Sequence, residues 1–194
     1  MKKLCLSVRI LTTPPLMAMA LCFWLYCFTK NIFCSFSWLM MSLITLGFFP
    51  LSAYILQPIL PRVKHLGREG QRNLAMLFCF LGYLAGLVCS LAFGGSTGMV
   101  YVFLTYLLSG LLMVLFNKAL HIRASGHACG VFGPIAMIVL LGGPKGLILL
   151  PFYLLSGICS VKMRRHTVGE WLLGSALSPA AMLIAWLILG TPVL

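Results

Sequence analysis

Acidic residues are almost absent from this chain. Its 194 residues include two glutamates, Glu69 and Glu170, and no aspartate. Hard metal ions prefer carboxylate oxygens, and the His-Glu-x-x-His signature of many zinc hydrolases does not occur here. A metal-dependent membrane hydrolase built from the histidines and Glu170 therefore stays an alternative that the composition disfavours.

Charged residues of either sign are also scarce. They make up 8% of the chain, whereas a soluble domain carries about 25%. Hydrophobic residues make up 61%, and only short polar stretches separate the apolar runs. The N-terminal Met-Lys-Lys resembles the start of a signal peptide, but no good cleavage site follows, so we expect a retained first span. We predict one integral membrane domain over residues 1–194 that crosses the membrane several times.

Cysteine pairs of the Cys-x-x-Cys type are missing, although the chain has eight cysteines. These are scattered through apolar segments, which favours core or lipid-facing positions over disulfides and zinc sites. The formal net charge is +12. Because so little soluble surface is available, this charge indicates membrane topology and an anionic substrate rather than nucleic acid.

Long apolar runs recur along the whole chain and predict an all-α bundle of six or seven transmembrane helices. The second run contains Pro50 and Pro58, which predicts a kink or an interfacial end. The stretch Gly142–Gly146 predicts a tight turn between the fifth and sixth runs. The candidate spans are residues 10–28, 35–60, 73–93, 99–116, 128–142, 146–161 and 171–190.

Threading these spans back and forth sorts the polar residues strongly between two faces. One face receives twelve of the fourteen Lys and Arg, all four histidines and both glutamates, and only Lys30 and Lys145 fall on the other. The first face consists of residues 1–9, 62–72, 117–127 and 162–170; the second consists of residues 29–34, 94–98, 143–145 and the C-terminus.

Two causes explain this sorting. The positive-inside rule accounts for Lys and Arg and places the first face in the cytoplasm. Histidines and glutamates do not follow that rule, so we also predict an anion-binding site on this face. Lys2, Lys3 and Arg9 lie far in sequence from the other polar segments, and we attribute their charge to topology.

Three polar segments of this face each precede an apolar span: residues 62–72, 123–127 and 162–170. Helix N-termini favour anions, and basic side chains with two histidines suit a phosphoryl group. His166 and Glu170 are one helical turn apart, so a helix would place the carboxylate behind the imidazole and make it a better nucleophile. Ser125 is also a natural helix N-cap, a role compatible with phosphate binding.

These segments resemble the three motifs of the type-2 phosphatidic acid phosphatase superfamily, the membrane lipid phosphatases related to glucose-6-phosphatase and vanadium haloperoxidases. That family carries Lys-x6-Arg-Pro, then Pro-Ser-Gly-His, then Ser-Arg-x5-His-x3-Asp. This chain supplies Ser125-Gly126-His127 and His166-x3-Glu170 in the same order. The resemblance covers residues 60–190 and implies a phosphatase-like core there, with its site at helix N-termini.

The resemblance implies a metal-independent phosphatase, without cofactor, that hydrolyses a phosphomonoester or diphosphate of a lipid such as phosphatidate, phosphatidylglycerol phosphate or a polyprenyl phosphate. His166, held by Glu170, would attack phosphorus and form a phosphohistidine. His127 would protonate the leaving oxygen and then activate water. The phosphate ligands that the resemblance implies are Lys64, Arg72, Arg123, Ser125, Gly126, Lys162 and Arg165.

The chain departs from the family pattern at several positions. Ala124 replaces proline, Glu170 replaces aspartate, and Ser160 stands where the family has an arginine six residues before the nucleophile. The first motif lacks Arg-Pro, and its basic residues are one position further apart. Lys162, Arg164 and Arg165 are nearby substitutes for the missing arginine. Ser160 supports the alternative function, a catalytically inactive carrier that binds a lipid or an anion.

Overall fold

The structure, a computed structural model, describes residues 2–29 and 32–190. Over these ranges the chain forms helices and turns and no β-strand, which confirms the all-α prediction. Two stretches are π-helical, η1 (Leu43–Phe48) and η2 (Leu115–Ala119), and η3 (Pro144–Leu149) is a 3-10 helix. The α-helices are α1 (Lys2–Leu11), α2 (Pro14–Phe28), α3 (Phe36–Ser42), α4 (Phe49–Leu56), α5 (Pro61–Lys64), α6 (Gly67–Ala92), α7 (Thr97–Val114), α8 (Gly126–Gly142), α9 (Leu150–Lys162) and α10 (Val168–Leu189).

Each predicted apolar run is helical over most of its length, but fewer of the runs have the length of a membrane span. Among the described residues, five helical stretches are long and apolar enough to cross a membrane, and α1 with α2 forms a sixth if that bent pair is one span. Helix α8 has 17 residues and rises about 25 Å, less than the roughly 30 Å of a bilayer core. The five stretches are residues 36–56, 69–92, 97–119, 144–162 and 168–189.

The predicted first span, residues 10–28, is interrupted near its start. Helix α1 ends at Leu11 and α2 begins at Pro14, with a bend of 49° between them. Thr13 is extended, with φ −63° and ψ 144°. Proline disfavours helical geometry at the residue before it and is well suited to the first turn of a helix, so Pro14 and Pro15 impose this break.

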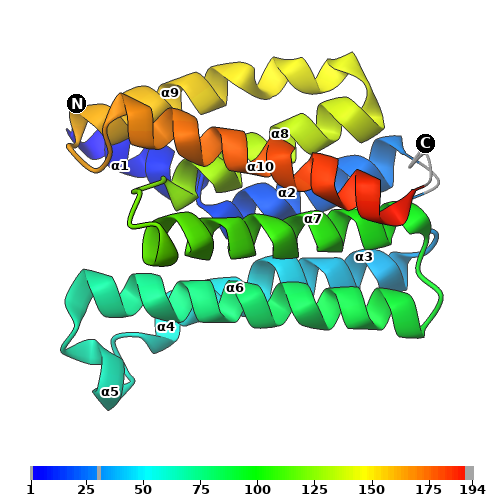
Figure 1. Cartoon of the computed structure of the whole chain (residues 1–194), viewed down its shortest axis with the longest axis horizontal. Coiled ribbons are helices and arrows are strands. Elements are labelled where there is room, and N and C mark those ends of the chain that lie inside the picture. The colour runs from blue at the N-terminus through cyan, green and yellow to red at the C-terminus, as the bar shows by residue number, and fades with distance from the viewer. Residues whose placement is uncertain (1, 30–31, 191–194) are drawn as a thin grey trace.

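The main core lies where α10 packs against α7 and α8 and where α2 packs against α8. Its largest fully buried side chains include Leu21, Phe103 and Ile138. Helices α4 and α6 pack together around a smaller cluster formed by Ala53, Leu74 and Ala75. Figure 1 shows α4, α5 and α6 along one side of the bundle, away from α9 and α10.

The polar segments gather at one end of the bundle. Figure 1 shows the start of α1, the α7–α8 connection and the α9–α10 connection at the same end, and the α6–α7 and α8–α9 connections at the other. This arrangement agrees with the threading of the two faces. Lys145 lies in η3, in the α8–α9 connection, whereas Lys30 lies outside the described residues.

Candidate functional site

His166 and Glu170 meet at the start of α10. The Nδ1 atom of His166 lies 2.9 Å from Oε2 of Glu170. Thr167 is the N-cap of α10 and Glu170 is its third residue, so the two form a capping box: Oγ1 of Thr167 accepts from the Glu170 amide at 3.1 Å, and the Glu170 carboxylate accepts from the Thr167 amide at 3.4 Å. One carboxylate therefore caps the helix and fixes the imidazole.

The hydrogen bond to Glu170 decides which nitrogen of His166 is available for chemistry. An ionised carboxylate only accepts hydrogen bonds, so Nδ1 carries the proton and Nε2 keeps a lone pair. Burial lowers the pKa of His166 below its ordinary value of 6.5, Glu170 acts in the opposite direction, and the positive charges of Arg9 and Arg123 lower it further. At neutral pH His166 is thus an uncharged imidazole with a free Nε2.

The second polar segment lies directly against the third. The backbone amide of Ser125 donates to the carbonyl of Glu170 at 2.9 Å. Gly174, one turn along α10, permits this contact, because a Cβ there would lie 2.2 Å from the Ser125 carbonyl oxygen. Nε of Arg123 lies 3.6 Å from Oε1 of Glu170, and because the Arg123 side chain is 69% exposed, this ion pair adds little stability.

Asn117 holds the chain that leads into Ser125. Its side-chain amide donates to the carbonyl oxygens of Met113 and Ala124 and accepts from the Ala124 amide at 3.2 Å. The three bonds fix the backbone just before the N-terminus of α8. Ser125 is fully buried there, and its Oγ accepts from the Ala128 amide as the helix N-cap.

His127 faces two hydroxyl groups contributed by other helices. Its Nε2 lies 3.1 Å from Oγ1 of Thr12 and 3.2 Å from Oγ of Ser156. Thr12 donates its own hydroxyl proton to the carbonyl of Val8 at 2.8 Å, so its oxygen accepts from Nε2–H of His127. This assignment leaves the lone pair of a neutral His127 on Nδ1. The two histidines are therefore fixed through opposite ring nitrogens.

A pocket of about 350 Å³ opens beside His166. It is lined by Arg123, Val161, Arg164, Arg165, His166, Thr167 and Glu170. Arg164 occupies the left-handed region with φ +51°. It completes a Schellman motif at the C-terminus of α9, in which the Arg165 amide donates to the Ser160 carbonyl at 3.0 Å and the Arg164 amide to that of Val161 at 2.9 Å. Glycine is the usual residue at such a position, so a strained arginine at the mouth of the pocket suggests a use for its charge.

The structure brings together some of the predicted site residues and not others. His166, Glu170, Arg123 and Arg165 line one pocket, and Ser125 and Gly126 lie directly beside it through the Ser125–Glu170 bond. His127 does not line that pocket. Three basic residues that the resemblance implied are exposed and line no part of it: Lys64, Arg72 and Lys162.

Several residues with a clear place in the site were missed by the sequence analysis. Thr12 and Ser156 bond His127, Asn117 fixes the α7–α8 connection, and Arg9 donates from Nη1 to Oγ of Ser160 at 2.6 Å. The one available signal was the pair Ser156 and Ser160, two hydroxyl residues one turn apart in an otherwise apolar run. Thr12 and Arg9 reach the site through tertiary packing of α1 on α9, which no local pattern reveals.

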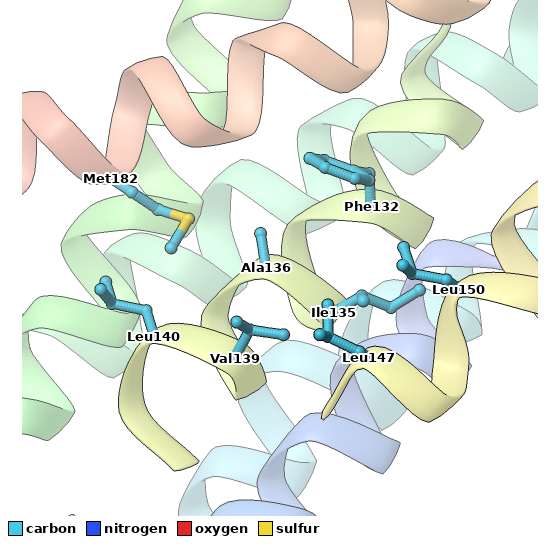
Figure 2. A pocket seen from close by; sticks show the side chains of 8 residues that line it. All are labelled: Phe132, Ile135, Ala136, Val139, Leu140, Leu147, Leu150 and Met182. Atoms are coloured by element: carbon cyan, nitrogen blue, oxygen red, sulfur yellow. The ribbon is translucent and has the colours of Figure 1, made fainter. Parts of the chain in front are cut away.

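A second cavity, of about 330 Å³, is entirely different in character. Figure 2 shows it between α8, α10 and the stretch from η3 into α9, lined by apolar side chains that include Phe132 and Met182. A series of aromatic contacts connects it with the polar end. Ring centroids are 6.0 Å apart between His127 and Trp171, 5.6 Å between Trp171 and Tyr153, and 5.1 Å between Tyr153 and Phe132.

The chain matches no model of a known protein family, no curated protein and no solved structure. Its function has to be inferred from the chemistry of the site itself.

Proposed function

We propose that this protein is a membrane phosphatase that removes phosphate from a lipid phosphomonoester or diphosphate through a phosphohistidine on His166. The observation that carries the proposal is the fixed imidazole. Glu170 binds Nδ1 of His166, which leaves an uncharged Nε2 beside three arginines, Arg123, Arg164 and Arg165. A nucleophilic nitrogen next to a concentration of guanidinium groups suits attack on a phosphoryl group.

In the proposed reaction Nε2 of His166 attacks phosphorus, and the bond between phosphorus and the lipid oxygen breaks. Burial and the positive charge of Arg9 lower the pKa of His127 to about 3, so free His127 is neutral. The negative charge of the bound substrate opposes this shift, and in the proposed reaction His127 takes up a proton on Nδ1 with the substrate and donates it to the leaving oxygen. Water then attacks the phosphohistidine, its proton passes to Nδ1 of His127, and inorganic phosphate leaves. The arginines neutralise the charge on the phosphate oxygens in both steps.

A lipid substrate is supported by the second cavity. The polar pocket and the apolar cavity are both bordered by α9 and α10, and the aromatic series runs from His127 at the polar end to Phe132 in the lining of the apolar cavity. An amphiphile would place its phosphate among the arginines and its tail along this apolar path. The excess of Lys and Arg at the polar end favours a cytoplasmic site under the positive-inside rule.

The test is phosphate release by purified protein in detergent, with EDTA present, from phosphatidate, phosphatidylglycerol phosphate and a polyprenyl diphosphate. We expect EDTA-resistant turnover of at least one lipid. His166→Ala should reduce it to background, and His127→Ala should reduce it by about 10²- to 10⁴-fold, the usual contribution of a general acid–base group. Turnover that persists in His166→Ala would exclude the proposed nucleophile, and turnover lost in EDTA would revive a metal mechanism.

One feature favours a second candidate, a carrier that binds the anion without hydrolysing it. Ser160 is fully buried and places a hydroxyl where the resemblance implies an arginine. A site short of one fixed positive charge would stabilise the charge of the transition state less, while the remaining arginines could still bind the anion. Retained binding of inorganic phosphate with no release from any lipid would support this candidate over the phosphatase.

A further inference from the structure

Arg9 extends from the last turn of α1 toward the α9–α10 connection. Its Nη1 donates to Oγ of Ser160 at 2.6 Å, across 151 positions of sequence. Thr12, the residue after α1, and Ser156, one turn before Ser160 in α9, form a second polar contact at 3.0 Å. The end of α1 and the residue after it are thus joined to α9 by two side-chain hydrogen bonds. Arg9 does not itself line the pocket, but it is held at Ser160, whose neighbour Val161 does.

The partly buried guanidinium of Arg9 has no carboxylate partner among the described residues. The chain has two acids, and the carboxylate of Glu170 is already bound to His166 and Arg123, whereas Glu69 forms no ion pair in the described part of the chain. A buried or half-buried positive charge without a counterion is unfavourable. A bound anion close to Ser160 would offset this charge.

Arg9 is close to the residues of the proposed phosphate site. Ser160 joins the two: its hydroxyl accepts from Arg9, and its carbonyl accepts from the amide of Arg165, which lines the pocket. Burial is the main cause of the lowered pKa of His166, and the positive charge of Arg9 adds to it. Ser160 is small and fully buried, which leaves the space beside it to the Arg9 side chain.

We propose that Arg9 of α1 supplies a guanidinium ligand for the phosphate of the substrate, in place of a basic residue at position 160. This inference rests on the proposed function. It replaces our attribution of Arg9 to membrane topology, and it makes the first helix part of the binding site. It also removes the main support for the inactive carrier, because the positive charge missing at Ser160 is delivered from another helix.

The first experiment compares Arg9→Ser with Lys3→Ser, an exposed residue of the same helix, since both variants lose one positive charge. We expect Arg9→Ser to lower kcat/KM on a lipid phosphate by about 100-fold, the usual effect of removing one donor to a transition-state oxyanion. Lys3→Ser should stay close to the wild type. Equal values for the two variants would overturn the assignment and return Arg9 to a topological role.

A double variant that exchanges the residues at positions 9 and 160 distinguishes the loss of a phosphate ligand from a loss of folding. Arg9→Ser vacates the space beside position 160 that Ser160→Arg needs. The double variant should recover at least about tenfold over Arg9→Ser alone, because the guanidinium returns to the same region from the other helix. A double variant no better than Arg9→Ser, although both elute as folded protein in detergent, would contradict the proposal.

Binding of inorganic phosphate separates this inference from the proposed function. Phosphate should raise the melting temperature of the wild type, and Arg9→Ser should need at least about tenfold more phosphate for the same rise, because a ligand stabilises only the state that binds it. If the wild type binds phosphate but hydrolyses no lipid, the phosphatase proposal fails and this comparison still decides the role of Arg9. If the wild type neither binds nor hydrolyses, both proposals fail.

Discussion

The two regions at the polar end of the bundle are both rich in basic residues but differ in structure. The region around α8, α9 and α10 is tied together by hydrogen bonds between segments far apart in sequence, among them Ser125 with Glu170 and Thr12 with His127. The region of α5 and the start of α6 bonds mainly to its neighbour α4, as when Nε2 of Gln57 donates to the carbonyls of Val63 and Gly67. A basic segment becomes part of a site only when packing fixes its groups against those of other helices.

The largest difference between the regions should appear at their histidines. His166→Ala removes the proposed nucleophile and should lower kcat by about 10⁶-fold, to background. His65→Ala, in the exposed turn between α5 and α6, should leave kcat within a factor of two to three of the wild type, on the order of the scatter for surface changes. Comparable losses in both variants would show that the α5–α6 region joins the site.

The variant Glu170→Gln distinguishes the role of Glu170 in capping α10 from its role in orienting the imidazole of His166. Glutamine also serves in a capping box, so the helix start should remain intact. The imidazole loses its orienting charge, and we expect kcat/KM to fall by about 10²- to 10⁴-fold, as when an orienting carboxylate is replaced by its amide.

The pH profile of Glu170→Gln should shift in a defined direction. Glu170 opposes the lowering of the His166 pKa, so its removal should lower that pKa further. Because the unprotonated imidazole is the reactive form, the acidic limb of the kcat/KM profile should move to lower pH. A shift to higher pH would mean that the limb reports another group.

Removing one positive charge should lower kcat/KM strongly in the α8–α10 region and only slightly in the α5–α6 region. Arg165→Gln removes a guanidinium that lines the pocket and should lower kcat/KM by about 100-fold. Lys64→Gln removes an exposed charge that lines no part of it, and we expect a change below about threefold, in line with the small energies of surface charges. A loss for Lys64→Gln as large as for Arg165→Gln would restore the first segment to the phosphate site that the resemblance implied.

The smallest expected effect concerns stability and compares two helix ends. Both Arg164 and Gly190 have positive φ after a helix, but only Gly190 has the residue that this conformation favours. Arg164→Gly should stabilise the protein by about 1 kcal/mol and Gly190→Ala should destabilise it by a similar amount. Thermal unfolding in detergent should show shifts of opposite sign, roughly 2–4 °C each. If Arg164→Gly lowers the melting temperature, the arginine is held by contacts worth more than its backbone strain.

The sequence predicted the helices and the polar end well, because apolar runs and charge sorting are local or one-dimensional signals. It also predicted the pairing of His166 with Glu170. The expected reason was wrong, because His166 precedes the N-cap Thr167 and meets Glu170 at the start of α10, not along a helical turn. It missed the break at Thr13, although Pro14 and Pro15 were visible. The predicted fifth span, α8, is shorter than a usual membrane span, although its two ends lie at opposite ends of the bundle (Figure 1). The partners Arg9 and Thr12 were beyond reach because they depend on how α1 packs on α9, and hydrogen bonds across 151 and 115 positions leave no periodic trace.

The alignment of α1 on α9 has a consequence for biosynthesis. In a chain inserted from its N-terminus, α1 and α8 enter the membrane before α9. Until α9 follows, the hydroxyl of Thr12 and the imidazole of His127 lack the hydrogen bonds of Ser156, and the Arg9 guanidinium lacks that of Ser160. Unpaired polar groups in the membrane are energetically costly, so the packing of the helices already inserted is unfavourable at this stage. Insertion of α9 provides hydrogen bonds for all three side chains at once. We therefore expect α1 to reach its final position only after α9 has inserted.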